Sequence, residues 1–320
     1  MFESGVTVKG FEPSDAGTWD EFIATSINGT FLHSRRFLSY HADRFHDLSL
    51  LVLDSRGRIV GVLPAAAGSE AGVVDSHPGI TYGGLVHQGK LVGDLAISAL
   101  GGIATHFHNL GYKMLRYRAI PRPYCREFAD DDSYALFRMN ARRTRVDLAA
   151  GFELARRKSS SHGRLHDLKE AAKHNVEVEI RSSAWSEFWA LLEELLASRY
   201  QTRPVHSLTE ITLLAQLFPD EIELVLARVA GVVVAGSALF HTSRVTHTQY
   251  LASSPIGREM GALSKVTEIA IERASALGRA WFSIGTSNED AGKVLNAGLY
   301  QWKLSFGSGS FVHEIFELPL

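Results

Sequence analysis

The stretch HTQYLASSPIGREMGALSKV, residues 247–266, decides the fold of this chain. Its first part alternates like a strand, and a glycine-bearing turn then leads into a long apolar-periodic helix. The free N–H groups and the dipole at such a helix start attract phosphate. Gly257 and Gly261 permit close backbone approach, and Arg258 adds a positive charge. The pattern predicts a phosphate site, and a plain strand-to-helix connection is the alternative.

Around this stretch the second half predicts the order helix, three meandering strands, helix, strand, helix, strand. Hydrophobic periodicity places these elements at 184–200, 222–229, 232–243, 245–254, 258–278, 280–286, 289–299 and 310–320. Ala230-Gly231 joins the first two strands, and Gly278 closes the long helix. The fold class is therefore α/β with a mixed, mostly antiparallel sheet flanked by helices.

The first half has a similar order of elements. We expect strands at 6–11, 48–54, 58–67 and 114–120, an irregular strand over 72–86, and helices at 15–27, 34–45 and 91–111. The segment 152–175 is rich in Lys, Arg, His and Ser, and predicts one or two helices broken near Ser159–Ser161 and Gly163. We place the domain boundary near residue 150, giving domains 1–150 and 151–320.

The composition is that of an ordinary globular protein. Of 320 residues, 45% are hydrophobic and 21% are charged, which argues against a disordered or fibrous chain. A net charge of −2 provides no overall basic field for DNA or membrane, although a local patch remains compatible with it. Cys125 is the single cysteine, and no stretch reaches the length of a membrane span. We expect a cytoplasmic protein without a signal peptide.

Arg258, Gly261 and Ala262 resemble the phosphate fingerprint of the GNAT acyltransferase superfamily, with Leu263 where that family has a final small residue. The resemblance covers about residues 180–320. It implies acyl-CoA as cosubstrate at this turn, with no metal. The residues that it implies for binding acyl-CoA are Ser253, Ser254, Gly257, Arg258, Gly261 and Ala262.

A narrower resemblance spans nearly the whole chain. SIGTSNEDAGKVLNAGLYQWKLSFG, residues 283–307, is similar to the C-terminal signature of the two-GNAT-domain Fem-type family. Segments 30–45, 76–84, 204–211 and 248–254 look closer to its branch of sugar N-acyltransferases from O-antigen and capsule clusters. The resemblance implies two tandem GNAT-like domains with an active site where they meet.

The same resemblance implies a reaction. It is transfer of an acyl group from CoA to the amine of a nucleotide-linked deoxyamino sugar in polysaccharide biosynthesis, by direct attack on the thioester. One alternative is an aminoacyl-tRNA-dependent transferase of peptidoglycan bridges, which would make tRNA a partner. Another is a catalytically inactive GNAT-like module that binds a nucleotide sugar or a protein. The expected partners of the main reading are small molecules only.

Two histidines are candidates for the proton acceptor, since imidazole titrates near neutral pH. His77 lies among glycines with Tyr82, so both side chains are expected to project into a cleft; a hydrogen-bonded structural histidine is the alternative. His247 is the second choice. In Fem-type enzymes the lysine that matches Lys303 lies near the transferred acyl group and stabilises the oxyanion.

The remaining candidates are polar residues for substrate binding. Strand alternation puts His247 and Gln249 on one face, and Tyr250 on the other. In the loop after the 184–200 helix, arginine suits the capture of phosphate or carboxylate. After strand 280–286, neutral amides and carboxylates suit sugar hydroxyls or an amine, and helix capping is the alternative. These substrate-binding candidates are Tyr82, Arg199, Arg203, His206, Gln249, Tyr250, Ser287, Asn288 and Glu289.

Overall fold

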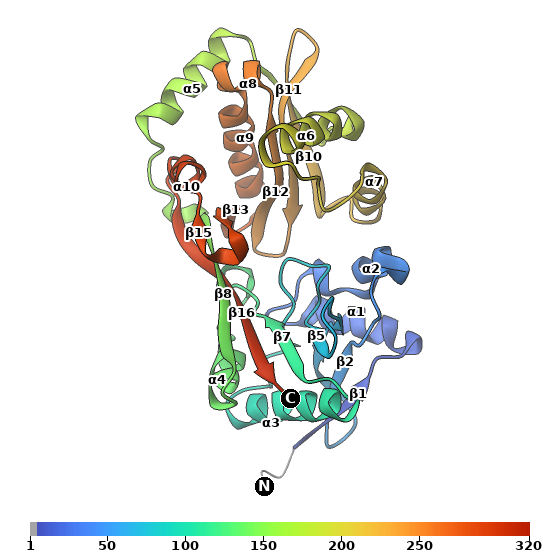
Figure 1. Ribbon diagram of the computed structural model, residues 1–320. Coiled ribbons are helices and arrows are strands. Elements are labelled where there is room, and N and C mark those ends of the chain that lie inside the picture. Colours follow the sequence, from blue (N-terminus) through green and yellow to red (C-terminus); the bar gives the residue numbers. More distant parts are fainter. Residues whose placement is uncertain (1–4) are drawn as a thin grey trace. The chain divides into compact units, whose positions relative to one another are not determined.

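A computed structural model describes residues 5–320. The chain forms two compact units (Figure 1). Unit 1 holds residues 5–148, 288–294 and 311–320, and unit 2 holds 149–287 and 295–310. We expected 151–320 to form the second domain as one continuous segment. The structure differs because the last strand returns to unit 1, where Ile315–Pro319 pairs with the strand Met114–Arg118.

Unit 1 contains two sheets and its own hydrophobic core. An antiparallel sheet has the order β1-β2-β3-β6, and a mixed group has the order β4-β5-β7-β16, with β5 parallel to β7. The strands are β1 Val6–Gly10, β2 Leu50–Asp54, β3 Ile59–Leu63, β4 Ala66–Ala67, β5 Val73–Asp75, β6 Val86–His87, β7 Met114–Arg118 and β16 Gly309–Pro319; the helices are α1 Ala16–Thr25, α2 Arg35–Leu38, α3 Asp94–Asn109 and α4 Asp131–Arg138. The apolar face of α3 packs its buried Leu100, Ile103 and Phe107 into this core.

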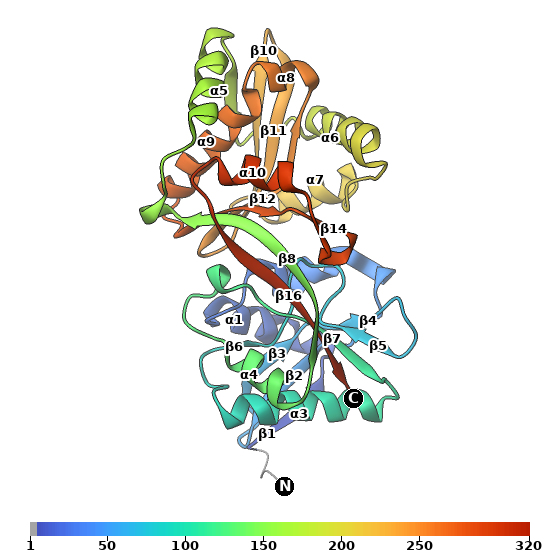
Figure 2. The same ribbon diagram turned by 60° about the vertical axis from the view of Figure 1, so that its left-hand side comes forward.

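Unit 2 is a sheet with one long helix on each face (Figures 1 and 2). Its strand order is β13-β12-β11-β10-β9, and Ala149–Glu153 of β8 pairs with β13. The strands are β8 Arg142–Glu153, β9 Glu177–Ile180, β10 Ile222–Val229, β11 Val232–His241, β12 Val245–Ser253 and β13 Trp281–Thr286; the helices are α5 His162–Lys173, α6 Trp185–Tyr200, α7 Leu208–Leu217, α8 Pro255–Glu259, α9 Ala262–Ala276 and α10 Ala297–Leu304. Two short strands, β14 Asn288–Glu289 and β15 Val294–Leu295, pair with each other.

Alternation along the strands explains the two layers. Val225 and Ala227 of β10 belong to the core that α9 covers. On the other face Gly236 leaves room for Phe188 of α6, and a Cβ at Gly236 would lie 2.7 Å from that ring. The meander follows the predicted turn, since Ala230 and Gly231 both have positive φ angles, which a tight two-residue hairpin requires.

Three expected elements are wrong in detail. The expected helix over 258–278 is interrupted, because Gly261 adopts φ +66° between α8 and α9. The expected helix over 289–299 starts later, at Ala297, and Asn296 caps it by accepting a hydrogen bond from Leu299 N–H. Gly163 does not break the basic segment, since α5 begins at His162, with Ser161 as its cap, and continues through the glycine.

The strict alternation expected along β12 is also wrong. Tyr250 pairs with Ala238 and Thr248 pairs with Leu239, so Gln249 is the extra residue of a β-bulge. Helix α7 was missing from the sequence prediction. Along residues 5–320 no helix combines the length and the apolar character needed to cross a bilayer.

Candidate active site

The candidate site of unit 2 is a fork between two parallel strands. β12 and β13 pair only at their starts, with His247 and Ser283 as the last partners. β12 continues to Ser253, while β13 pairs with β8 along its length and ends at Thr286. Beyond His247 the edge of β12 that faces β13 therefore lacks a strand partner among the described residues. Backbone groups exposed in this way can bind an extended ligand or a carbonyl oxygen.

Lys303 of α10 points its amino group at this fork. Its side chain is 5% exposed, and Nζ donates a hydrogen bond to the carbonyl oxygen of Thr286 at 2.5 Å. Among the described residues no carboxylate pairs with it. Burial lowers the pKa of Lys303 from 10.5 to about 7, because the interior disfavours the ammonium form.

Because Gly285 has no side chain, the ring of His247 can lie at the same part of the fork as the amino group of Lys303. A Cβ added to Gly285 would lie 3.3 Å from Cε1 of His247 and 3.9 Å from Nζ of Lys303. The His247 ring is held through Nδ1, 3.1 Å from Oγ of Ser283, and Ser283 Oγ also accepts from Gly285 N–H. The structure thus brings together the predicted catalytic residues His247 and Lys303.

Two buried hydroxyls lie where the strands separate. Oγ1 of Thr248 and Oγ of Ser287 have no hydrogen-bond partner among the described residues, and both side chains are buried. A buried polar atom without a partner is costly in a native protein and often marks a place for water or ligand. Ser287 was a predicted substrate contact. Thr248 and Ser283 were missed, since only the tertiary fork gives them a role.

The predicted phosphate turn is packed by the protein itself. Ser254 caps α8 by accepting from Gly257 N–H, and Arg258 donates to the carbonyl of Ser253 at 3.1 Å. A Cβ at Gly257 would overlap the carbonyl oxygen of Val234. Gly257 therefore permits close contact between two segments of unit 2, whereas the sequence predicted close contact between the backbone and a phosphate.

Helix α5 lies on the start of α9. A Cβ at Gly261 would overlap the carbonyl oxygen of Asp167, and Oγ of Ser264 donates to the Asp167 carboxylate at 2.6 Å. Arg164 of α5 also donates to Ser264 Oγ, at 2.6 Å. Ala262, the last predicted acyl-CoA contact, is fully buried in the core. A carboxylate thus already stands at the helix start where a diphosphate was expected.

Tyr250 and His206 join a loop to the sheet. The Tyr250 hydroxyl lies 2.6 Å from Nδ1 of His206 and accepts from His206 N–H at 3.3 Å. Burial raises the pKa of Tyr250 to about 12. Arg199 and Arg203, predicted beside His206 as donors to an anion, are exposed.

His77 and Tyr82 belong to unit 1. Nδ1 of His77 accepts from Gly79 N–H, and burial, followed by the neighbouring charge of His41, lowers the pKa of His77 to about 3. This pKa makes the ring a weak proton acceptor at neutral pH, which disfavours its predicted role. Tyr82 is 2% exposed and its hydroxyl donates to Thr30.

The polar run after β13 is divided between the units. Asn288 belongs to unit 1, where its amide accepts from Leu148 N–H at 2.6 Å and donates to the carbonyl of Gly292 at 3.1 Å. Its side chain thus closes a turn of the chain. Glu289 is exposed. Among the described residues no three His, Cys, Asp or Glu side chains form a group suited to a metal ion.

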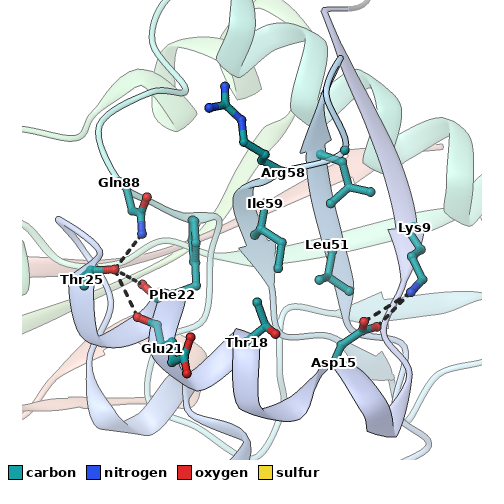
Figure 3. A pocket seen from close by; sticks show the side chains of 12 residues that line it. Lys9, Asp15, Thr18, Glu21, Phe22, Thr25, Leu51, Arg58, Ile59 and Gln88 are labelled. Atoms are coloured by element: carbon teal, nitrogen blue, oxygen red, sulfur yellow. Dashed lines mark hydrogen bonds and ion pairs between the residues drawn. The ribbon is translucent and has the colours of Figure 1, made fainter.

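Unit 1 has a hollow of about 640 Å³ on its antiparallel sheet (Figure 3). Its floor is apolar, with Phe22, Leu51 and Ile59, and its rim is charged. Lys9 on the rim bonds to Asp15, while Arg58 pairs with Asp54. Both cations of the rim are thus paired with carboxylates, and among the described residues the hollow holds no buried titratable group comparable to Lys303, which leaves the fork of unit 2 as the better candidate for catalysis.

Three solved structures have a fold similar to that of this chain. FemX matches with a TM-score of 0.70 at 12% identity, over 98% of this chain and 97% of that one. L-PGS from Bacillus licheniformis matches with 0.63 at 9% identity, over 96% and 92%. A tandem GNAT protein from the clavulanic acid biosynthesis pathway matches with 0.57 at 10% identity, over 98% of both chains. These likenesses show the fold, a tandem GNAT architecture over nearly the whole chain.

No curated protein sequence matches the chain significantly. The model of the acetyltransferase (GNAT) domain matches residues 138–303, which is just over half of the sequence and contains the fork, the turn and Lys303. The chain belongs to the acetyltransferase (GNAT) domain family.

Proposed function

We propose that the chain transfers an acyl group to an amine at the fork between β12 and β13, with an aminoacyl ester of tRNA as the donor. The fork offers a buried amine and, as far as residues 5–320 are concerned, an unpaired strand edge and two hydroxyls without partners. Such groups suit the developing negative charge of an acyl carbonyl under attack. The Fem-type resemblance of residues 283–307 supports the same reaction class.

The packing of the turn at 254–264 favours an aminoacyl ester over acyl-CoA as the donor. Gly261 lies against the backbone of Asp167, and the Asp167 carboxylate accepts from Ser264 at the start of α9. A diphosphate at this turn would meet both the helix α5 and a negative charge. An aminoacyl ester on a ribose hydroxyl needs no diphosphate there.

The proposed reaction is a direct substitution. The acceptor amine attacks the ester carbonyl, a C–N bond forms, and the bond to the ribose oxygen breaks. Lys303 stabilises the oxyanion, and His247, oriented by Ser283, accepts the proton that the amine loses. That proton then passes to the leaving ribose oxygen. The protein contributes positioning and electrostatic stabilisation.

A second candidate is the acyl-CoA-dependent N-acylation of a nucleotide-linked amino sugar. The observation in its favour is the strand-turn-helix start itself, with the Ser254 cap and Arg258 beside it. In that reaction the thioester replaces the ribose ester at the same fork. Coenzyme A would then have to displace part of α5 or approach the turn from another side.

A transfer assay with two donors separates the candidates. The protein is incubated with tRNA charged with radiolabelled amino acids or with acetyl-CoA, against a panel of amine acceptors that includes nucleotide-linked amino sugars and peptidoglycan precursors. We expect label from tRNA on an acceptor amine, and none with Lys303→Met. Turnover of acetyl-CoA alone would replace the proposal with the second candidate. Binding of a nucleotide sugar without transfer from either donor would indicate an inactive module.

A further inference from the structure

The exposed side of α5 carries two lysines and two histidines. His162, His166, Lys169 and Lys173 follow at spacings of four, three and four residues, which places them along one side of the helix. We call these four residues the basic face of α5. All except Lys173, which pairs with Glu170, lack a carboxylate partner among the described residues.

Of the two acidic residues of α5, Asp167 points toward α9, and Glu170 borders the basic face, where it pairs with Lys173. Asp167 accepts a hydrogen bond from Ser264 of α9 and also pairs with Arg164 within α5. Glu170 has a side chain that is 25% exposed and pairs with Lys173 and His174. The opposite side of α5 packs on α9 (Figures 1 and 2), so it is not available to a ligand.

The segment before α5 extends the positive charge toward the catalytic helix. Arg156 and Lys158 are exposed, and Lys158 has no carboxylate partner among the described residues. The backbone of this segment is fixed against the end of α10, because Ser161 N–H donates to the carbonyl of Ser305 at 2.8 Å. Helix α10 carries Lys303 into the fork. A basic track of about 18 Å, the length of a twelve-residue helix, therefore starts beside the catalytic helix.

We propose that the basic face of α5, with Lys158, binds the phosphate backbone of the tRNA that brings the acyl group to the fork. This inference rests on the proposed function, because it assigns a binding surface to that donor. The track runs away from α10, as a polynucleotide must when its acylated end lies beside Lys303. The whole chain has a net charge of −2, so contact with phosphates requires a local positive patch. The basic face of α5 provides such a patch.

An anionic membrane is a poorer fit to the same charges. A helix that lies on a lipid surface needs a broad apolar side to insert between headgroups. The exposed side of α5 offers one large apolar residue, Leu165, which is 47% exposed. The apolar side of α5 is packed against α9.

The experiment measures binding of fluorescently labelled, deacylated tRNA at salt concentrations from 50 to 200 mM. The variant is Lys158→Ala with Lys169→Ala, two exposed lysines that form no ion pair within the described part of the chain. The matched control is Arg56→Ala with Lys90→Ala, two exposed positions of unit 1 with the same change of charge. Vesicles of phosphatidylglycerol serve as a second probe.

We expect the α5 variant to bind tRNA more weakly and to lower the slope of log affinity against log salt by about 1.8, or about 0.9 per lost phosphate contact. The control should keep the wild-type slope. An unchanged slope in the α5 variant would refute the surface while leaving the donor intact. Wild-type protein that neither binds tRNA nor transfers from it would refute both. Loss of vesicle binding, with tRNA binding unchanged, would assign the face to a membrane and overturn the inference.

Discussion

The amino group of Lys303 is held 2.5 Å from the carbonyl oxygen of Thr286, in a side chain that is 95% buried and without a carboxylate among the described residues. A structural lysine at such a depth is normally paired with an acid, because an isolated ammonium loses much of its hydration. The strand end of β13 instead supplies one neutral acceptor. The remaining N–H groups of Lys303 are therefore available for a ligand that carries or develops negative charge.

Replacing Lys303 by methionine should abolish most of the transfer. We expect turnover to fall by about 10²–10³-fold, the usual effect of removing one oxyanion donor. Methionine keeps the length and burial of the side chain, so the fold should persist. Single-turnover assays at saturating donor and acceptor measure the effect. The control is Lys293→Met, which changes an exposed lysine of unit 1. If Lys303→Met turned over at the wild-type rate, Lys303 would not be the residue that stabilises the oxyanion.

The stability of the protein should depend on pH through the same residue. The pKa of Lys303 is about 7 in the folded chain and 10.5 in the unfolded one, so between these values only the unfolded state holds the proton. The free energy of unfolding should then rise with pH across this window, by at most about 1.4 kcal/mol per unit. Below pH 7 both states are protonated and the folded state bears the full cost of burying the ammonium.

Urea denaturation of wild type and Lys303→Met between pH 6 and 9.5 measures this dependence. We expect the methionine variant to be more stable at pH 6, with the gap narrowing as pH rises. Turnover of the wild type should fall above pH 7, because the ammonium that stabilises the oxyanion is lost. A gap that stays constant over the whole range would show that the amine keeps its proton in the folded state.

Local patterns located most of the strands and the helix α6 of unit 2. The hairpin at Ala230 and Gly231 follows from two residues that tolerate positive φ, and the apolar period of 184–200 corresponds to α6. Helix α7 could also have been found, because Ser207 and Glu210 form a capping box three residues apart. The family expectation of a tandem GNAT fold is confirmed by the structural matches.

Contacts between distant segments account for what the sequence analysis missed. Asp290, Ala291 and Gly292 have positive φ angles, and Gly292 packs against the carbonyl of Val146, so the residues expected to start a helix form a turn. The bulge at Gln249 depends on its partner strand β11. Neither the turn at 290–292 nor the bulge at Gln249 can be predicted from neighbouring residues in the sequence. Lys303, in contrast, was found through the family motif, and its burial in the fork then gave it a physical role.

Tyr250→Phe should loosen the loop that follows α6. The hydroxyl of Tyr250 holds His206 by contacts to both its ring and its backbone. We expect a loss of about 1 kcal/mol in the free energy of unfolding and faster amide exchange over residues 201–207. The control is Tyr134→Phe, an exposed tyrosine on α4. A higher KM with unchanged exchange would instead indicate that the hydroxyl binds substrate directly.

Gly261→Ala tests whether α5 fills the phosphate turn. Gly261 and Gly278 both have φ of +66°, but only at Gly261 would a Cβ overlap another segment, the backbone of Asp167, whereas Gly278 has open space around its Cβ position. Gly278→Ala should therefore cost only the backbone strain, about 1–2 kcal/mol. Gly261→Ala should cost clearly more, because α5 must also move. Urea denaturation of both variants measures the difference, and amide exchange over 162–173 reports on α5. Equal losses at the two glycines would mean that α5 is held loosely, which would reopen the turn to a diphosphate and favour acyl-CoA as the donor.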